Sequence, residues 1–369
     1  MNQDTIMPEA SAQLLERVGG VIDTRIGDVS DQPVLLMVSG GSDSTALAYI
    51  AHDLQKQGVF TDVVMLHVNH KLRGADADED ARFVAGLAQS LHIPLFSCEV
   101  DVNEIVRSTH GNMEAIARNE RYRAAKEALE STCKHLGYPE GSGIICTAHT
   151  ADDRVENFYM RSIVGTGPGG FRSMHYATYI EGCKVVRPVL EESRESLRRY
   201  IQDSAEAYTG AHKEKWREDA TNEDTDRFRA FVRHEIVPRA KERNPQLLET
   251  LTRTMNLIGD EDDMVTAQAR TVLIEKVQPL GQTPQEGMLV SPLLAEEPLP
   301  VQRRVIERML KIMFPLEERI ESASIEACLE TLGCSGKVVN IQKNYAVSYN
   351  KQGLRVEPME DFRARRNRI

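Results

Sequence analysis

The stretch VLLMVSGGSDSTAL, residues 34–47, decides the fold. Its five apolar residues at 34–38 predict a short strand that is buried on both faces. The segment SGGSDS then turns the chain into a helix, because Leu47, Ala51 and Leu54 recur at helical spacing. Glycines let the backbone approach a ligand closely, and the first amides of a helix have no acceptor within it. We therefore expect a phosphate-binding loop, reinforced by the positive end of the helix dipole.

The side chains of residues 39–44 add to this phosphate-binding chemistry. Hydroxyl groups at Ser39, Ser42 and Ser44 supply further donors, and the Asp43 carboxylate can hold a magnesium ion. No Gly-Lys-Ser/Thr closes the turn, so it is not a Walker A loop, and it is not the dinucleotide fingerprint either. An ordinary strand–helix turn is the alternative. The motif resembles the SGGxDS signature of the PP-loop ATP pyrophosphatases, which cleave ATP between the α and β phosphates.

Length and composition describe a globular protein of two or three domains, with 369 residues of which 27% are charged and 41% apolar. No run of eighteen apolar residues and no signal peptide is visible, so we expect no membrane span and a cytoplasmic location. The six cysteines are scattered without a CxxC pair, which argues against disulfides and metal clusters. The net charge of −11 means that an RNA-binding protein of this sequence would have to concentrate its basic residues locally.

Further apolar runs predict buried strands at residues 63–68, 93–100, 144–148 and 185–190. Helical patterns separate these runs, and strands that alternate with helices form βαβ units with a parallel sheet. After residue 207 the composition changes, and the patterns predict helices at residues 228–239, 245–276 and 300–313. Near the end, residues 338–341, 346–349 and 354–356 alternate around Asn-Lys-Gln-Gly, which predicts a β-hairpin.

The fold class that follows is α/β. We expect a parallel-sheet PP-loop domain at residues 1–207, then a mostly helical domain at residues 208–369 that ends in the hairpin and a basic, mobile tail, RARRNRI. Residues 227–243 contain six cationic and two acidic side chains, which makes them the local basic patch that an acidic RNA-binding protein needs. A solvated helix face is the alternative.

Polar side chains follow the predicted strand 144–148 at its carboxyl end, where open α/β sheets bind ligands. His149, Asp153 and Glu156 are spaced four and three residues apart, so one helical face carries an imidazole and two carboxylates. A surface helix often begins with acids, which is the alternative. Three such groups beside a phosphate-binding loop indicate metal binding or general-base catalysis. The glycine-rich segment 165–174 that follows is either a plain turn or a mobile flap.

Two other segments carry polar side chains near the predicted sheet. Strand 63–68 ends in a polar cluster that includes Asn69, His70 and Arg73. The predicted helix that contains residues 114–122 brings Glu114, Arg118 and Arg121 to one side, because they are three to four residues apart. These side chains form either an intrahelical Glu–Arg pair or an arginine face directed at a phosphate or nucleobase.

Taken together, the motifs resemble one branch of the PP-loop enzymes, the tRNA(Ile)-lysidine synthetases. The similar segments are SGGSDS at 39–44, HVNHKLR at 67–73, EAIARNERY at 114–122, TAHTADDRVEN at 147–157, VVRPVL at 185–190 and EDATNEDTDRFRAFVRHEIVP at 218–238. The final segment 335–358 resembles the hairpin that ends the family's central helical domain. We expect the extra C-terminal domain of longer members to be absent, because the chain ends soon after this hairpin.

The resemblance implies an ATP-dependent ligase with ATP and magnesium as cofactors. Its partners would be the isoleucine tRNA with a CAU anticodon and free L-lysine. ATP would adenylate the C2 oxygen of the first anticodon cytidine and release pyrophosphate, and the lysine ε-amine would then displace AMP to give lysidine. An amide-type oxygen is a poor leaving group whereas AMP is a good one, which explains the need for ATP. The sequence leaves open whether the protein is a homodimer.

The resemblance also implies a role for each matching residue. The residues implied in catalysis are Asp43, His149, Asp153, Glu156 and Arg229. Those implied in ATP binding are Ser39, Gly40, Gly41, Ser42, Asp43 and Ser44 with His67, Asn69 and Arg118, and Asp43 is also the magnesium ligand. Those implied in contact with the substrate and tRNA are His70, Arg73, Glu114, Arg121 and Arg233. Asp153 and Glu156 would attract the lysine ammonium, which must lose a proton to become a nucleophile.

Three positions depart from the family pattern. Asn157 stands where many members have Thr, Val164 stands where Arg usually precedes the glycine segment, and Ala230 stands where Asn usually follows the arginine. Two alternatives therefore stay open: another PP-loop enzyme, such as a tRNA thiolase or an amide-forming synthetase, and a tRNA- or nucleotide-binding protein that has lost catalysis. A thiolase would need paired cysteines, which the sequence lacks.

Overall fold

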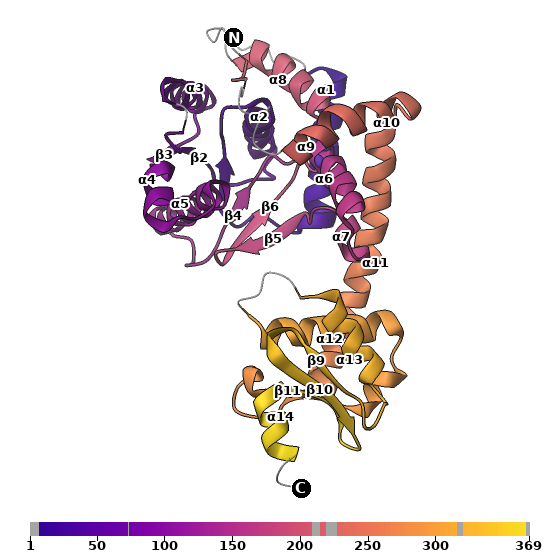
Figure 1. Ribbon diagram of the computed structural model, residues 1–369. Helices are drawn as coiled ribbons and strands as arrows, with labels where there is room; N and C mark the ends of the chain where they lie inside the picture. Colours follow the sequence, from indigo (N-terminus) through magenta and orange to yellow (C-terminus); the bar gives the residue numbers. More distant parts are fainter. Residues whose placement is uncertain (1–6, 73, 209–214, 219–226, 316–319, 367–369) are drawn as a thin grey trace. The chain divides into compact units, whose positions relative to one another are not determined.

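The computed structural model describes residues 7–72, 74–208, 215–218, 227–315 and 320–366 (Figure 1). Arg73, for which a role in contact with the tRNA is expected, lies outside the described residues. The chain divides into two compact units, Met1–Asn256 and Leu257–Ile369. This division differs from the boundary expected after residue 207.

The first unit is built on a mostly parallel sheet. Its strands are β1 (Val34–Met37), β2 (Val63–Asn69), β3 (Leu95–Glu99), β4 (Ile144–Cys146), β5 (Ala177–Ile180) and β6 (Cys183–Val186). They lie in the order β3-β2-β1-β4-β6-β5. All neighbours pair in parallel except β5, which pairs antiparallel with β6. The predicted α/β class with a parallel sheet is therefore confirmed.

Helices cover both faces of this sheet (Figure 1). The helices up to residue 208 are α1 (Glu9–Val21), α2 (Ser42–Lys56), α3 (Ala75–Leu91), α4 (Val102–Thr109), α5 (Met113–Leu136), α6 (Ala151–Val164), α7 (Pro168–Phe171) and α8 (Arg194–Tyr208), with a π-helical turn at Ile22–Ile26. Apolar side chains of α1, α2, α3 and α8 form one core with the sheet. Those of α5 form a second core with Leu35, Val64 and Ile145, which point to the opposite face. Because side chains alternate between the faces of a strand, each central strand must be apolar throughout.

The expected strand at residues 185–190 is shorter than predicted and has an unpredicted partner. The strand β6 ends at Val186, and the chain then turns, with the Leu190 amide bonded to the Arg187 carbonyl. Pro188 has no amide hydrogen with which to continue the ladder. The edge strand β5 precedes β6 in a hairpin whose two turn residues, Glu181 and Gly182, both have positive φ.

Residues 227–256 pack on α6, which explains why the first unit extends past residue 207. They form α9 (Arg227–Phe231), a π-helical turn (Val232–Ile236), α10 (Val237–Arg243) and the start of α11 (Leu247–Lys276). Val155 of α6 is fully buried in one apolar cluster with Val232, Val237 and Met255. Arg154, only 1% exposed, donates from Nη1 to Asn256 Oδ1 at 2.9 Å. These contacts fix α6 between the sheet and the later helices.

The second unit combines helices with an antiparallel sheet of order β7-β8-β11-β10-β9. Its elements after α11 are β7 (Val277–Pro279), β8 (Met288–Val290), α12 (Leu299–Met313), α13 (Ser322–Thr331), β9 (Val338–Ile341), β10 (Tyr345–Asn350), β11 (Gly353–Pro358) and α14 (Met359–Arg366), with 3-10 turns at Pro284–Glu286, Pro292–Glu296 and Gln342–Asn344. The predicted hairpin is confirmed as β10–β11, in which Val347 pairs with Val356. The core of the second unit is apolar, with Met309, Val347 and Leu354 fully buried.

The expected mobile tail is wrong for its first part, because residues 359–366 form α14. Phe362 is buried, and the Arg365 guanidinium donates to Glu357 Oε1 at 2.6 Å. These two contacts hold the basic segment on β11. The remaining residues 367–369 lie outside the described part of the chain. Within that part, no helix has the length and apolar character that a membrane crossing requires.

The division at residue 256 predicts how fragments of the first unit behave. We expect a fragment of residues 1–256 to unfold cooperatively on heating. A fragment of residues 1–207 would lack the side chains that bury Val155, and each such buried apolar side chain contributes about 1.5–3 kcal/mol. We therefore expect its unfolding free energy in urea to be lower by about 4 kcal/mol or more. Equal stability of the two fragments would contradict this division.

Candidate active site

The expected site residues gather where the strand order reverses. The strand β1 lies between β2 and β4, and the chain leads from β1 toward one edge of the sheet and from β4 toward the other. In open α/β sheets, the crevice outside the carboxyl ends of two such strands is the usual ligand site. Residues 39–44 follow β1, and residues 147–156 follow β4. The fold thus brings the phosphate-binding loop and the acids of α6 to one edge.

Hydrogen bonds within the chain shape the phosphate-binding loop. Gly40 has φ of 98°, a left-handed conformation that glycine adopts without strain. Ser44 Oγ accepts the Ser39 amide at 3.2 Å and donates to the Gly41 carbonyl at 3.1 Å. The hydroxyl of Ser44 therefore holds the turn itself, a use that the sequence alone does not show. Gly41 caps α2 with extended backbone angles.

A described segment outside these elements contacts the same loop. The Arg217 amide donates to the Gly40 carbonyl at 2.9 Å, and its guanidinium donates to Asp80 Oδ1 at 3.1 Å and Glu79 Oε2 at 2.7 Å. Trp216 packs against the main core, with the Arg198 guanidinium 5.5 Å from its ring centroid. Residues 215–218 therefore tie the outer side of the loop to α3.

The start of α6 orients the first acid of the pair. Thr150 caps the helix, and its amide and hydroxyl both donate to Asp153 Oδ2, at 2.9 and 3.0 Å. The Asp153 amide donates in return to Thr150 Oγ1, which completes a capping box. Because Oδ2 is engaged in the cap, Oδ1 of Asp153 is the oxygen that faces the cations across the crevice.

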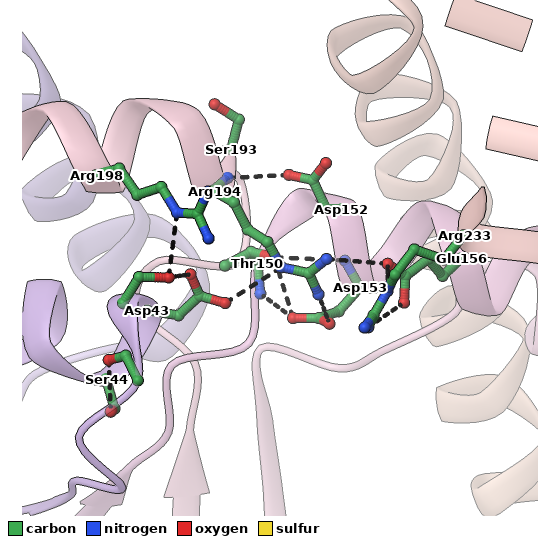
Figure 2. Close-up of polar contacts among 12 residues, drawn as sticks. Asp43, Ser44, Thr150, Asp152, Asp153, Glu156, Ser193, Arg194, Arg198 and Arg233 are labelled. Atoms are coloured by element: carbon green, nitrogen blue, oxygen red, sulfur yellow. Dashed lines mark hydrogen bonds and ion pairs between the residues drawn. The ribbon is translucent and has the colours of Figure 1, made fainter. Parts of the chain in front are cut away.

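Arg194, at the start of α8, joins the two sides of the site (Figure 2). Its Nε lies 3.3 Å from Asp43 Oδ2. Its Nη2 lies 2.5 Å from Asp153 Oδ1, and its Nη1 lies 3.0 Å from Glu156 Oε1. Its backbone amide donates to Asp152 Oδ2 at 2.9 Å. Arg194 was not among the residues expected from the sequence, and the available signal was its place after the predicted strand 185–190 and the acids Glu191 and Glu192.

Two arginines from the helices after α8 complete the cluster. Arg229 donates from Nε to Glu156 Oε2 at 3.0 Å and from Nη2 to Asp153 Oδ1 at 3.1 Å. Arg233 makes a bidentate pair with Glu156, at 2.8 and 3.0 Å. The Glu156 side chain is 3% exposed and is therefore an almost fully buried charge with several cationic partners.

The pKa values of the acids of the site are shifted in different directions. Burial alone would raise the pKa of Asp153, but Arg194, His149, the Thr150 amide and Arg229 together lower it. Burial likewise opposes ionisation of Glu156, and Arg233 and Arg194 outweigh it, so its pKa is also lowered. The pKa of Asp43 is raised, because burial outweighs its contact with Arg194 and the neighbouring Asp153 charge adds to the effect. Asp153 and Glu156 are therefore charged near neutral pH.

His149 stands beside the acid pair as a neutral imidazole. Burial lowers its pKa to about 4, with the charges of Arg187 and Arg118 acting in the same direction and Asp153 opposing them. Its Nδ1 lies 3.0 Å from Thr147 Oγ1. At neutral pH this ring can accept a proton, but its low pKa makes it a weak base.

The other expected residues lie at the carboxyl end of β2 and on α5. His67 Nδ1 contacts the Val38 carbonyl at 2.9 Å, and Asn69 bonds to Asp78 and to the Lys71 amide. Burial, together with the nearby Arg121 charge, lowers the pKa of His70 to about 4. Three buried ring nitrogens, both of His70 and Nε2 of His67, have no hydrogen-bond partner among the described residues. Such buried, unpaired nitrogens suit a ligand that brings its own polar groups.

The helix α5 presents its expected residues on the outside. Arg118 lies over the ring of Tyr122, 5.0 Å from the centroid, and both Arg118 and Glu114 are exposed. Arg121 is exposed as well. The contacts described above join Asp43, Asp153, Glu156, Arg229 and Arg233 in one cluster, and the residues of β2 and α5 are not among its contacts.

The three departures from the family pattern lie on α6 and α9. Asn157 donates to the Ser173 carbonyl at 3.2 Å, Val164 ends α6 and is 70% exposed, and Ala230 is half-buried on α9. Arg161 Nη1 donates to the Gly170 carbonyl at 3.0 Å. The glycine segment therefore packs on α6 and contains the short helix α7, so a plain turn does not describe it.

Comparison with known proteins decides the family, because a model of the PP-loop domain matches residues 14–240. The chain belongs to the PP-loop family. The predicted relationship to the PP-loop ATP pyrophosphatases is thereby confirmed, and ATP is the cofactor that a domain of this family binds.

Several curated relatives of this PP-loop protein carry the name tRNA(Ile)-lysidine synthase. The one from Thermus thermophilus is 34% identical over 284 residues, which are 76% of this chain and 48% of the relative. The one from Geobacter sulfurreducens is 32% identical, over 76% of this chain and 55% of the relative. The one from Dehalococcoides mccartyi is 28% identical, over 86% and 64%. The chain thus spans about half the length of the curated relatives it matches.

The residues of the PP-loop fit a magnesium ion only together with bound phosphate. Among the described residues, no group of three or more His, Cys, Asp or Glu side chains could hold a metal ion. Magnesium is, however, commonly held by one or two carboxylates and the phosphates of a nucleotide. Asp43 fits that mode, because it lies in the first turn of α2 beside the loop and its Oδ1 accepts the Ser42 hydroxyl at 3.1 Å.

The buried Glu156 predicts a pH-dependent loss of stability. Glu156→Gln would leave Arg233 without its charged partner, and breaking a buried pair costs about 3–5 kcal/mol. Because the folded pKa is lowered, the carboxylate stabilises the protein above its unfolded pKa of about 4.3, and this contribution is lost as the pH falls further. In urea unfolding, we expect a large difference from the natural protein at pH 7 and a smaller one below about pH 4.

The matched control for this variant is Glu235→Gln. Glu235 also pairs with an arginine, Arg239, at 2.8 Å, but both side chains are largely exposed. We expect that control to cost at most about 0.5 kcal/mol at any pH. A Glu156→Gln protein as stable as the control would show that the cluster does not depend on this charge.

Proposed function

We propose that this chain is a tRNA(Ile)-lysidine synthetase, an ATP-dependent ligase that acts on the first anticodon cytidine of the isoleucine tRNA with a CAU anticodon. The observation that carries the proposal is the bridge from Asp43 through Arg194 to Asp153 and Glu156, at 3.3, 2.5 and 3.0 Å. A phosphate-binding loop and an ionised acid pair lie within one side chain of each other. A reaction that joins a nucleotide-activated group to an amine needs both.

In the first step, the cytidine C2 oxygen attacks the α phosphorus of ATP. The bond from that phosphorus to the bridging oxygen breaks, and pyrophosphate leaves. The amides at the start of α2 and around Gly40 would hold the leaving diphosphate, with the helix dipole adding attraction. Magnesium, when bound beside Asp43, would supply further positive charge to the phosphates.

In the second step, the lysine ε-amine attacks C2, the bond from C2 to the adenylated oxygen breaks, and AMP leaves. Lysine arrives as an ammonium ion, which Asp153 and Glu156 would attract because both are ionised at neutral pH. The amine must lose a proton before it attacks. His149 is neutral and can receive that proton, although its pKa of about 4 favours passing it on to solvent.

The expected basic patch at residues 227–243 would serve the tRNA in part. Arg229, Arg233 and Lys241 face the acids, with Lys241 Nζ 3.1 Å from Asp152 Oδ1. Arg239 and Arg243 are exposed on α10 and remain suited to phosphate contacts. The proposal therefore assigns Arg229 and Arg233 to the acid pair, and the outer arginines to the RNA backbone.

The test of this function is incorporation of labelled lysine into a tRNA transcript with a CAU anticodon. With ATP, magnesium and the transcript, we expect release of pyrophosphate and uptake of lysine, and a transcript with a different first anticodon base should take up none. Pyrophosphate release without lysine transfer would favour another PP-loop enzyme. Binding of tRNA without turnover would favour a protein that has lost catalysis.

A second test concerns Asp43. Asp43→Ala would remove the carboxylate proposed to hold magnesium, which stabilises the transition state by several kcal/mol. We expect pyrophosphate release to fall by about a hundredfold or more, while the affinity for tRNA, measured by filter binding, stays within about twofold. A variant that stays active would rule out the magnesium assignment.

A further inference from the structure

Arg194 lies where the two steps of the proposed reaction meet. Among the described residues, it alone contacts both the acid of the PP-loop, Asp43, and the acid pair of α6. Figure 2 shows its guanidinium between these carboxylates. Any ligand that changes the charge on one side of Arg194 therefore acts on the other side through the same group.

The acid cluster is already neutralised by the protein itself. The carboxylates of Asp43, Asp152, Asp153 and Glu156 are paired with Arg194, Arg229, Arg233 and Lys241. A lysine ammonium that enters would be one cation more than the carboxylates can pair, and an unpaired charge in a buried site is costly. One resident cation must therefore withdraw from the acid pair before the ammonium can bind well.

Arg194 is the cation with somewhere else to go. Arg233 holds Glu156 through two parallel bonds, which is the most stable form of such a pair. The first turn of α8, where Arg194 lies, faces the first turn of α2, and Arg198 one turn later reaches within 3.5 Å of Ser42 Oγ. A planar guanidinium also binds phosphate bidentately, so nucleotide phosphates beside Asp43 would offer it a partner of equal quality.

We propose that Arg194 couples the two substrates: it neutralises Asp153 and Glu156 in the empty site and turns to the phosphates when the nucleotide binds. Lysine then binds well only after ATP, which prevents the amine from occupying the site unproductively. Coupling between two sites typically changes affinity about 5- to 150-fold, and it must be equal in both directions. This inference rests on the proposed lysidine-forming function.

The test is calorimetric titration of lysine into the whole chain, with and without a non-hydrolysable ATP analogue and magnesium. We expect the analogue to tighten lysine binding at least fivefold in the natural protein. In Arg194→Ala, the acids lose a competing cation, so lysine should bind more tightly without nucleotide and the analogue should change its affinity less than twofold. Arg194→Lys keeps the charge but cannot contact all three acids at once, so its coupling should be intermediate.

The matched control is Lys241→Ala. It removes one positive charge from the same cluster, but Lys241 contacts Asp152 and not the acids that Arg194 bridges. We expect this variant to keep the nucleotide dependence, so loss of coupling there would show that net charge alone is responsible and overturn the proposal. Circular dichroism of each variant shows whether it is folded. If Arg194→Ala is unfolded, Arg194→Lys takes its place in the test.

The remaining outcomes separate this inference from the function on which it rests. Lysine binding to the natural protein that is equally tight with and without the analogue would overturn the role of Arg194 and leave the lysidine-forming function standing. Natural-strength coupling in Arg194→Ala would do the same. Failure of lysine to bind in either state would overturn the proposed function itself, and the inference with it.

Discussion

The need to neutralise buried carboxylates governs the arrangement of the first unit. Asp153 and Glu156 lie on α6, which follows the carboxyl end of β4. Both side chains are buried there, so an unpaired charge would be costly. Their partners come from α8 and from the helices after residue 226, so distant segments converge on one crevice. The apolar cluster around Val155 holds those later helices in place. Charge pairing and packing thus support the same junction, and the two cannot be altered independently.

Much of the fold was predictable because buried parallel strands are apolar throughout. Residues 34–38, 63–68 and 144–148 match β1, β2 and β4 within two residues. The strands β5, β7 and β8 escaped prediction because they are short edge or near-edge strands, too short to show a pattern along the sequence. The end of the first unit at residue 256 was not predictable from composition, since it depends on which helix packs against α6. The tail was misread because its first residues belong to α14, whose buried side chain, Phe362, lies just before the charged segment.

The candidate site was predictable where spacing along the chain carries the signal. Asp153 and Glu156 share a helical face, and Asp43 lies in a recognisable loop, so all three could be predicted as site residues. Arg194 lies 151 residues from Asp43 in the sequence, and no periodicity relates the two. The internal role of Ser44 was equally hidden, because a serine in such a loop can bind a ligand or the backbone. His67 and His70 were named from a motif, and their unpaired nitrogens give that choice a physical reason.

The capping box at the start of α6 has a consequence for how this site can change over time. One oxygen of Asp153 holds the first turn of the helix, and the other meets the arginines. A substitution there therefore damages the scaffold and the charge pattern in a single event, so any deficit it causes has two sources. Glu156 sits one turn later and has no part in the cap. A change at position 153 therefore disrupts both the helix cap and the charge pairing, whereas a change at position 156 disrupts the charge pairing and leaves the cap intact.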